Sequence, residues 1–418
     1  MDVEFLGGAR EIGRSAILVD DRLLLDYGMD SGDPPRFPIR EPDPDAVVVS
    51  HGHLDHVGSL PSLLSGDARP PVYWTSPTRD LALLLARDTL DLHGGTYDCP
   101  FTEAEIARLT QVSTTHGYRE PFSVLGGADD GGYDVTFYDA GHIPGSAHVL
   151  VDDGETRLFY SGDFHTEDQQ LLAGTTARPE ADAVIVESTY ADTEREPRSA
   201  IESAFVESLR TTLWEGGTVV VPAFAIGRTQ EVLAICAAHD VECYADGMGT
   251  RVAELLTRPR NREFLRDPDV LRRATANARF VTGRTGQRKR IAAQSTVIVT
   301  TSGMLHGGPA MTYVPEIRTH PVNKITFTGY QVDGTPGREL LETGSAEIDG
   351  QLMPISARAE HYDFSAHADR NGLRDFLDAY ADATILVNHG DRCERFASDL
   401  CGAGYDAAAP ELGDRCAL

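Results

Sequence analysis

Three histidines and one aspartate fall within six positions near the start of the chain, where residues 51–56 read HGHLDH. In an extended segment His51 and His53 project to the same side, because the side chains of a strand alternate. A tight turn after them would bring Asp55 and His56 back toward a second position. Neutral imidazoles and carboxylates at this spacing suit zinc, which takes nitrogen and oxygen ligands at about 2.0–2.2 Å. A single histidine is more often a packed or hydrogen-bonded residue, but this cluster favours a metal site.

The same residue types recur where apolar runs end. The runs LLL, VVV, TFY, LFY, VIV and ILV lead into an acid or a histidine at Asp26, His51, His142, Asp163, Glu187 and His389. Active sites of α/β proteins form in the crevice outside such strand ends. One zinc needs three or four protein ligands. Two ions would therefore account for seven candidates, which are His51, His53, Asp55, His56, His142, Asp163 and His389.

The elements that must position these residues are short strands alternating with helices. Helical spacing of apolar residues is present over residues 60–64, 79–90 and 103–109. After residue 198 the pattern changes to a helix over 201–213, the buried strand TVVVPAF and a helix over 228–239. This βαβ-like order is compatible with a separate sheet. A chain of 418 residues exceeds one average domain, so we expect layered α/β architecture with two domains or one large insertion.

The net charge of −28, with only two lysines among 37 basic residues, differs from that of typical RNA-binding proteins, which carry a basic face. Two interpretations compete: the chain does not bind nucleic acid, or its acidic surface is an adaptation to a cytosol of very high salt. We favour the halophilic hypothesis, because at about 1 M salt the Debye length falls to roughly 3 Å and surface repulsion is screened.

Further features limit location and cofactors. No apolar run of about eighteen residues is present, so no membrane span is expected. The first ten residues lack the basic-then-apolar pattern of a signal peptide, which predicts a cytoplasmic protein. The six cysteines form no CxxC pair, which favours reduced thiols over a disulfide framework. No Walker A or GxGxxG sequence occurs, so no nucleotide cofactor is expected.

The HxHxDH pattern of residues 51–56 resembles the signature of the metallo-β-lactamase superfamily, and AGHIPGSAH and YSGDF resemble its third-histidine and bridging-aspartate segments. Five later motifs resemble the β-CASP nucleases: ESTYAD, VPAFAIGRTQE, TTSGMLHGGPA, DFSAHAD and LVNHGD. SGMLHGG is more similar to the cleavage and polyadenylation specificity factor branch than to RNase J. Without an N-terminal KH extension, the chain resembles the shorter archaeal members.

The resemblance implies an α/β fold, a metallo-β-lactamase αββα sandwich with an inserted β-CASP α/β domain. The implied division is a first part of the metallo-β-lactamase domain over residues 1–190, the inserted domain over 191–340 and a return to the first domain over 341–418. It also implies two Zn²⁺ per chain. One zinc would be held by His51, His53 and His142, the other by Asp55, His56 and His389, and Asp163 would bridge them.

The resemblance further assigns roles beside the metals. Asp26 would orient ligands and water from the second shell. Glu187 and His367 would form the pair that delivers protons, with His367 as the general acid. Two ions about 3.5–4 Å apart would clamp the scissile phosphate and supply a nucleophile at neutral pH. The expected products carry a 5′-phosphate and a 3′-hydroxyl.

By the same resemblance, the inserted domain would cap the metal cleft and form a channel for single-stranded RNA. Guanidinium forks match phosphate oxygens, and residues 284–290 are the most basic window of the chain. For each basic residue a solvated role on a helix end or loop is about equally expected. The candidates for RNA contacts are Arg228, Arg284, Arg288, Lys289, Arg290 and Arg338.

The function that these features favour is a zinc-dependent ribonuclease, an endonuclease with 5′-3′ exonuclease activity as a further mode, in RNA 3′-end processing, maturation or decay. Two alternatives remain: a small-molecule hydrolase of the same fold, and a non-catalytic subunit of an RNA-processing complex. The inserted segment disfavours the first and the intact set of ligands disfavours the second. For the oligomeric state only analogy with relatives is available, and it indicates a homodimer through the C-terminal segment.

Overall fold

The computed structural model describes residues 1–32 and 34–418, and contacts divide them into two units. Unit 1 comprises Met1–Glu167, Gly174–Glu194 and Ala366–Leu418. Unit 2 comprises Asp168–Ala173 and Arg195–Ser365. The division into domains over residues 1–190, 191–340 and 341–418 remains a prediction. Within the described residues, no helix has both the length and the apolar composition that crossing a bilayer requires.

Unit 1 contains two seven-stranded sheets. The first runs in the order β22 (Arg415–Ala417), β1 (Asp2–Gly7), β2 (Ala16–Val19), β3 (Leu23–Leu25), β4 (Ala46–Val48), β5 (Val72–Trp74) and β6 (Ser113–Thr115). The second runs in the order β21 (Asp406–Ala408), β20 (Thr384–Asn388), β11 (Ala183–Glu187), β10 (Arg157–Tyr160), β9 (Ala147–Asp152), β8 (Tyr133–Asp139) and β7 (Phe122–Val124). The last strands of the chain are therefore built into both sheets, with β22 beside β1 in the first and β20 beside β11 in the second.

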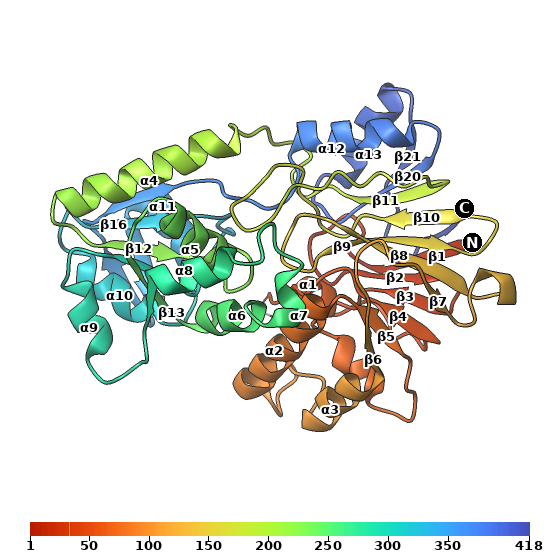
Figure 1. The fold of residues 1–418 in the computed structure, drawn as a ribbon, viewed down its shortest axis with the longest axis horizontal. Helices are drawn as coiled ribbons and strands as arrows, with labels where there is room; N and C mark the ends of the chain where they lie inside the picture. The colour runs from red at the N-terminus through yellow and green to blue at the C-terminus, as the bar shows by residue number, and fades with distance from the viewer. Residues whose placement is uncertain (33) are drawn as a thin grey trace. The chain divides into compact units, whose positions relative to one another are not determined.

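The two sheets pack face to face through alternate apolar residues such as Phe5, Val48, Phe137 and Ile185, all fully buried. The outer face of the first sheet is covered by α2 (Ser76–His93), α3 (Glu103–Val112) and the 3-10 helix Leu60–Leu64. The outer face of the second is covered by α12 (Arg370–Leu377) and α13 (Cys393–Gly402). Figure 1 shows these helix pairs on opposite sides of the strands of unit 1. The predicted αββα sandwich is confirmed.

Unit 2 is built on a six-stranded parallel sheet. Its order is β14 (Ala278–Phe280), β13 (Cys243–Asp246), β15 (Val297–Thr300), β12 (Val219–Pro222), β16 (Lys324–Phe327) and β19 (Arg358–His361). A hairpin of β17 (Ser345–Ile348) and β18 (Gln351–Pro354) stands beside it. The central strands are buried on both faces, which explains their continuous apolar runs.

Helices connect the parallel strands of unit 2 (Figure 1). They are α4 (Arg198–Trp214), α5 (Arg228–Ala238), α6 (Met248–Leu256), α7 (Pro259–Arg262), α8 (Val270–Asn277), α9 (Gln287–Ala292), α10 (Ala310–Ile317) and α11 (Pro336–Thr343). The helices predicted over 201–213 and 228–239 and the strand TVVVPAF are confirmed as α4, α5 and β12. The predicted inserted α/β domain is confirmed as a separate sheet with its own core.

Candidate metal centre

The ends of six strands of unit 1 carry the predicted site residues to one edge of the two sheets. Strands β10, β11 and β20 are parallel neighbours, and β3 is parallel to β4. Their carboxyl ends, together with that of β8, lead into the residues that the sequence marked. These are Asp26 after β3, His51 after β4, His142 after β8, Asp163 after β10, Glu187 at the end of β11 and His389 after β20.

Two of these residues have left-handed backbone at the point where their strand ends. Asp26 has a φ of 58° and His389 a φ of 47°. Non-glycine residues in this region cost of order 1–3 kcal/mol and persist only where the surroundings impose them, commonly at functional sites. The turn at each position redirects a side chain from the strand into the centre of the cluster.

The first group of potential ligands consists of three imidazoles and one carboxylate: His51, His53, His142 and Asp163. One donor atom from each lies within 4.8 Å of the others. Nδ1 of His53 lies 3.0 Å from Nε2 of His142. Burial lowers the pKa of His51 and of His142 well below the usual value, which keeps both rings in the neutral form that binds metals.

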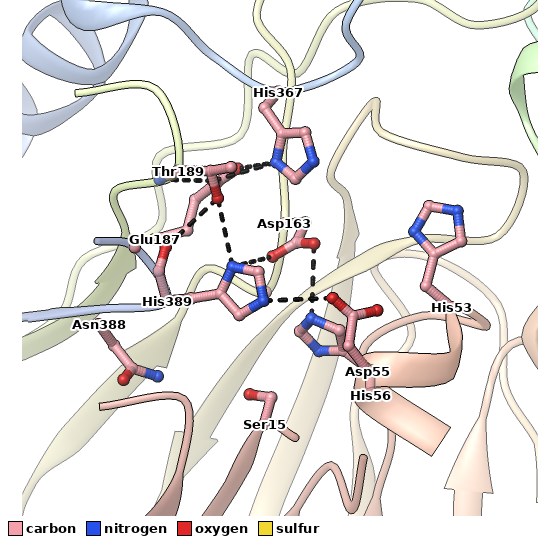
Figure 2. A network of polar contacts seen from close by, with 12 residues as sticks. Ser15, His53, Asp55, His56, Asp163, Glu187, Thr189, His367, Asn388 and His389 are labelled. Carbon is pink, nitrogen blue, oxygen red and sulfur yellow. Dashed lines mark hydrogen bonds and ion pairs between the residues drawn. The ribbon is translucent and has the colours of Figure 1, made fainter. Parts of the chain in front are cut away.

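The second group comprises Asp55, His56, Asp163 and His389, with donor atoms again within 4.8 Å of one another. Nε2 of His389 lies 3.4 Å from Oδ2 of Asp55, and Nδ1 of His389 lies 3.5 Å from Oδ1 of Asp163. Figure 2 shows His56, His389 and Asp55 turned toward Asp163. The seven predicted ligands are therefore brought together as two groups that share one carboxylate.

The chain reaches this geometry through a close approach of two loops. A Cβ atom on Gly28 would lie 1.7 Å from the main-chain oxygen of Asp55. The absence of a side chain at this position lets the segment after β3 pack directly under the turn that carries Asp55 and His56. The main-chain nitrogen of Tyr27 also donates to the oxygen of His56, at 2.9 Å.

Asp163 carries the negative charge at the centre. It is 2% exposed, and burial alone would raise the pKa of its carboxyl. The imidazoles of His389, His56 and His51 outweigh burial and hold the pKa of Asp163 well below its usual value. Its Oδ2 lies 3.5 Å from Nε2 of His51 and 3.4 Å from Nε2 of His56. Oδ2 thus lies between a histidine of each group, which is the placement that a bridging ligand needs.

The donor atoms fit metal ions by a separate criterion. Among the described residues, four buried atoms of this cluster lack any hydrogen-bond partner: Nε2 of His51, His56 and His389, and Oδ1 of Asp163. A buried polar atom without a partner costs about 1–3 kcal/mol. Four such atoms of zinc-binding type that face one another are the pattern expected where cations complete the site.

Asp26 holds one ligand in position. Its Oδ2 accepts a hydrogen bond from Nδ1 of His56 at 2.7 Å. Since a carboxylate only accepts, Nδ1 carries the proton and Nε2 presents its lone pair to the centre. The same carboxylate accepts from Ser50 N, Ser50 Oγ and Tyr160 Oη, at 2.7, 2.6 and 2.8 Å. Asp26 therefore lies behind His56, in contact with a potential ligand, which is the placement that the resemblance implies.

Glu187 and His367 form a pair beside the metal ligands (Figure 2). Nδ1 of His367 lies 3.0 and 3.1 Å from the two carboxylate oxygens of Glu187. Glu187 is buried and also accepts from the main-chain nitrogens of Phe164 and Thr189, at 2.9 and 3.3 Å. Burial alone would lower the pKa of His367, but the Glu187 carboxylate outweighs it and raises the pKa.

Comparison with protein-family models matches three stretches of the chain. Residues 21–213 match the beta-lactamase superfamily domain, residues 230–340 the Beta-Casp domain, and residues 352–410 the Zn-dependent metallo-hydrolase RNA specificity domain.

Full-length relatives agree with these matches. RNase aCSPSF2 of Saccharolobus solfataricus is 34% identical over 432 residues, which cover 100% of this chain and 85% of that protein. The chain belongs to the β-CASP family of the metallo-β-lactamase superfamily. Probable RNase MJ4 of Methanocaldococcus jannaschii is 29% identical over 99% of both chains. Transcription termination factor FttA of the same organism is 31% identical over 95% of this chain and 68% of its own.

A solved structure agrees on the architecture. The crystal structure of a protein of unknown function from Enterococcus faecalis V583 matches with a TM-score of 0.62 at 13% identity, over 100% of this chain and 99% of the other. At this identity the likeness shows a shared fold and nothing further.

Several residues of this β-CASP site were not predicted from the sequence. Ser50 contacts Asp26 and also places Oγ 3.1 Å from Nδ1 of His51. Thr189 places Oγ1 3.2 Å from Nδ1 of His389. Tyr160 reaches Asp26 from the other sheet. All three stand within three positions of a predicted site residue, and that proximity was the available signal.

Three of the six basic residues predicted to contact RNA are paired with acids of unit 2. Arg288 contacts both carboxylate oxygens of Asp246, at 2.7 and 3.1 Å. Lys289 lies 2.9 Å from Glu316, and Arg338 lies 2.6 Å from Glu342. These partners give each cation a structural role within the β-CASP unit.

The other three differ. Arg228 is half-buried at the start of α5. Arg284 and Arg290 are exposed and make no ion pair with any residue in the described part of the chain. Arg284 precedes the short helix α9 of the β-CASP unit, and Arg290 lies within it. Of the predicted set, these two arginines have the environment best suited to phosphate oxygens of a ligand.

Proposed function

We propose that this protein is a ribonuclease that binds two Zn²⁺ and hydrolyses the phosphodiester backbone of single-stranded RNA. The observation that carries the proposal is the pair of ligand groups that share Asp163 and leave buried donor atoms without partners. The match of residues 352–410 to a Zn-dependent metallo-hydrolase RNA specificity domain supports RNA as the substrate. The relatives named RNase aCSPSF2 and Probable RNase MJ4 support it as well.

His51, His53 and His142 would hold one zinc, Asp55, His56 and His389 the other, and Asp163 would contact both. When bound, such a pair of ions supplies Lewis-acid stabilisation of phosphoryl oxygens and a nucleophile at neutral pH. The protein then has to orient the ligands and to provide a proton for the leaving oxygen.

Two pairs of residues meet these needs. Asp26 fixes the tautomer of His56, so that Nε2 of that ring faces the centre. Glu187 binds Nδ1 of His367, which leaves Nε2 as the atom of that ring that transfers a proton. His367 acts as the general acid toward the leaving 3′-oxygen, and the products carry a 5′-phosphate and a 3′-hydroxyl.

We further propose endonucleolytic cleavage with 5′-3′ exonuclease activity as a second mode, in RNA 3′-end processing, maturation or decay in the cytoplasm of an archaeon. The test is incubation with RNA labelled at either end, with and without a chelator. Internal fragments that vanish with the chelator support the proposal. Intact RNA under all conditions, at a full zinc content, would indicate the non-catalytic alternative.

Two further proposals concern the surface charge and the oligomeric state. The acidic surface, with a net charge of −28, is proposed to be an adaptation to molar salt. Thermal stability that is equal at low and at molar potassium chloride would contradict it. A homodimer through the C-terminal segment rests on analogy alone, and the mass of the particle in solution decides it.

A further inference from the structure

Phe224 is an exposed aromatic residue whose ring lies between two neighbouring loops. It follows β12, an inner strand of the parallel sheet of unit 2, and its side chain is 37% exposed. The neighbouring strands are β15 and β16, and the loops after them carry Gly303 and Gly329. The main-chain oxygen of Phe224 accepts from both N and Oγ1 of Thr229, at 3.0 and 2.7 Å, so its backbone is fixed.

The two glycines leave space for the Phe224 ring. A Cβ atom on Gly329 would lie 2.9 Å from Cε2 of the ring, closer than real Cβ contacts occur. A Cβ atom on Gly303 would lie 3.3 Å from Cδ1 and 3.0 Å from the main-chain nitrogen of Phe224. Both flanking loops therefore omit a side chain at the point where they meet the ring.

A buried side chain ties these two loops together. Nε2 of Gln331 donates to the main-chain oxygens of Gly303 and Gly329, each at 3.1 Å, and Gln331 is 3% exposed. A buried carboxamide that bridges two loops holds the space between them at a fixed width. The Phe224 ring is thus held between the two loops while part of its surface stays exposed.

The surroundings match the backbone of a nucleic acid. Nη1 of Arg228 lies 3.3 Å from the position of a Cβ atom on Gly329, so a guanidinium lies next to the ring. Tyr330, which follows Gly329 in the chain, is 53% exposed. Arg284 lies four residues beyond the carboxyl end of β14, and β14 is three strand spacings, or roughly 14 Å, from β12 in the same parallel sheet. An aromatic face with arginines along one sheet edge is the arrangement that binds single strands.

We propose that Phe224 is a stacking platform for an unpaired base of the substrate strand, held by Gly303, Gly329 and Gln331. Scattered exposed aromatic residues are common on protein surfaces. Trp214, which is 87% exposed at the end of α4, is such a residue in the same unit. Phe224 differs because two loops are shaped around it. The inference rests on the proposed function and assigns a substrate-binding residue beyond the metal centre.

The test is steady-state cleavage of single-stranded RNA by the metal-loaded protein, combined with stopped-flow quenching of 2-aminopurine placed in the same strand. Phe224→Ala and Phe224→Leu should raise KM about 5- to 100-fold, since one stacked base is lost, with little change in kcat. Phe224→Tyr keeps an aromatic ring and should keep KM and quenching at the wild-type values. Trp214→Ala is the matched control and should behave as wild type. Melting temperatures show that each variant is folded.

Single-stranded DNA of the same sequence separates the two claims. If wild type cleaves RNA and Phe224→Leu matches it in KM and quenching, the platform is refuted while the ribonuclease stands. If wild type binds only DNA, and binding weakens in Phe224→Leu, the platform stands and RNA as substrate is refuted. If wild type binds neither strand, both fail.

Discussion

Nδ1 of His367 lies 3.0 Å from the carboxylate of Glu187, although 180 residues separate the two in the chain. Glu187 ends the strand β11, whereas His367 lies just after the chain returns to unit 1 at Ala366. The whole of unit 2 except Asp168–Ala173 is inserted between them. The contact between Glu187 and His367 therefore forms only when the segments of unit 1 on both sides of the insertion fold together.

Replacing His367 with alanine should reduce kcat for RNA cleavage about 10²- to 10⁴-fold, the usual contribution of a general acid, without loss of zinc. Its ring bonds to Glu187, and with Asp163 these two residues form a third group of possible metal ligands. The proposed function places both zinc ions in the other two groups, which do not include His367. Single-turnover kinetics and metal analysis of the same sample check this. Loss of a zinc from the variant would mean that the residue is a ligand instead.

Replacing Asp26 with asparagine should weaken zinc binding about 10- to 100-fold, as removal of an outer-shell carboxylate usually does. The amide can still accept from Ser50 but no longer holds the proton on Nδ1 of His56 by charge. Competition with a chromogenic chelator measures the affinity. Asp45→Asn, an exposed acid paired with Arg22, is a control that should bind zinc normally. Equal affinity in both variants would contradict the role given to Asp26.

Arg284→Ala and Arg290→Ala should each reduce, by about one, the slope of the logarithm of the RNA-binding constant against the logarithm of the salt concentration. The reason is that both arginines are exposed and lack an acidic partner in the described structure. Arg288→Ala should instead lower the melting temperature, since Asp246 would lose its bidentate partner. Binding titrations from low to high salt, with a thermal melt of each variant, distinguish the two classes. The same slope in all three variants would refute the division.

The acid side of the stability curve should depend on His148. Burial lowers the pKa of this ring to about 3, and its nitrogens contact Ser161 O and Thr175 Oγ1, at 2.7 and 3.1 Å. The unfolded chain binds a proton at this residue below about pH 6.5, whereas the folded protein does not. Its contribution is thus complete above pH 6.5 and is lost as pH falls toward 3, by about 1.4 kcal/mol per pH unit.

His148→Gln removes that titration. Urea unfolding of chelator-treated protein between pH 6 and pH 4.5 should show a free energy of unfolding that falls less steeply in the variant, by about 1.4 kcal/mol per unit. The variant's stability at pH 7 sets the baseline. Parallel curves for both proteins would show that the ring is not excluded from protonation.

The candidate site residues were predictable because strand ends and ligand types coincide in the sequence. Asp26, Asp163 and His389 each follow an apolar run that could only be a buried strand, and parallel strands place such ends together. The supporting contacts were not predictable. Ser50 and Tyr160 belong to different sheets, and only their packing brings both hydroxyls to Asp26.

The basic residues show where pattern fails. The window 284–290 is basic in sequence, but Asp246 and Glu316, 42 and 27 positions away from their partners, neutralise two of its cations. Long-range ion pairs leave no local signal. Residue type misleads in the same way at Trp214, which is 87% exposed because it ends α4 beyond the buried face of that helix. Phe224 lies within the motif VPAFAIGRTQE, but its role has no local signal because the glycines beside its ring come from two other loops.

Zinc content tests the central claim most directly. The protein is purified without added metal, equilibrated with zinc and freed of excess zinc. Elemental mass spectrometry should then find two zinc ions per chain in the wild type. Asp163→Asn should contain at most one, because that carboxylate belongs to both groups of ligands. A wild-type content near zero, or an unchanged content in Asp163→Asn, would contradict a shared dinuclear centre.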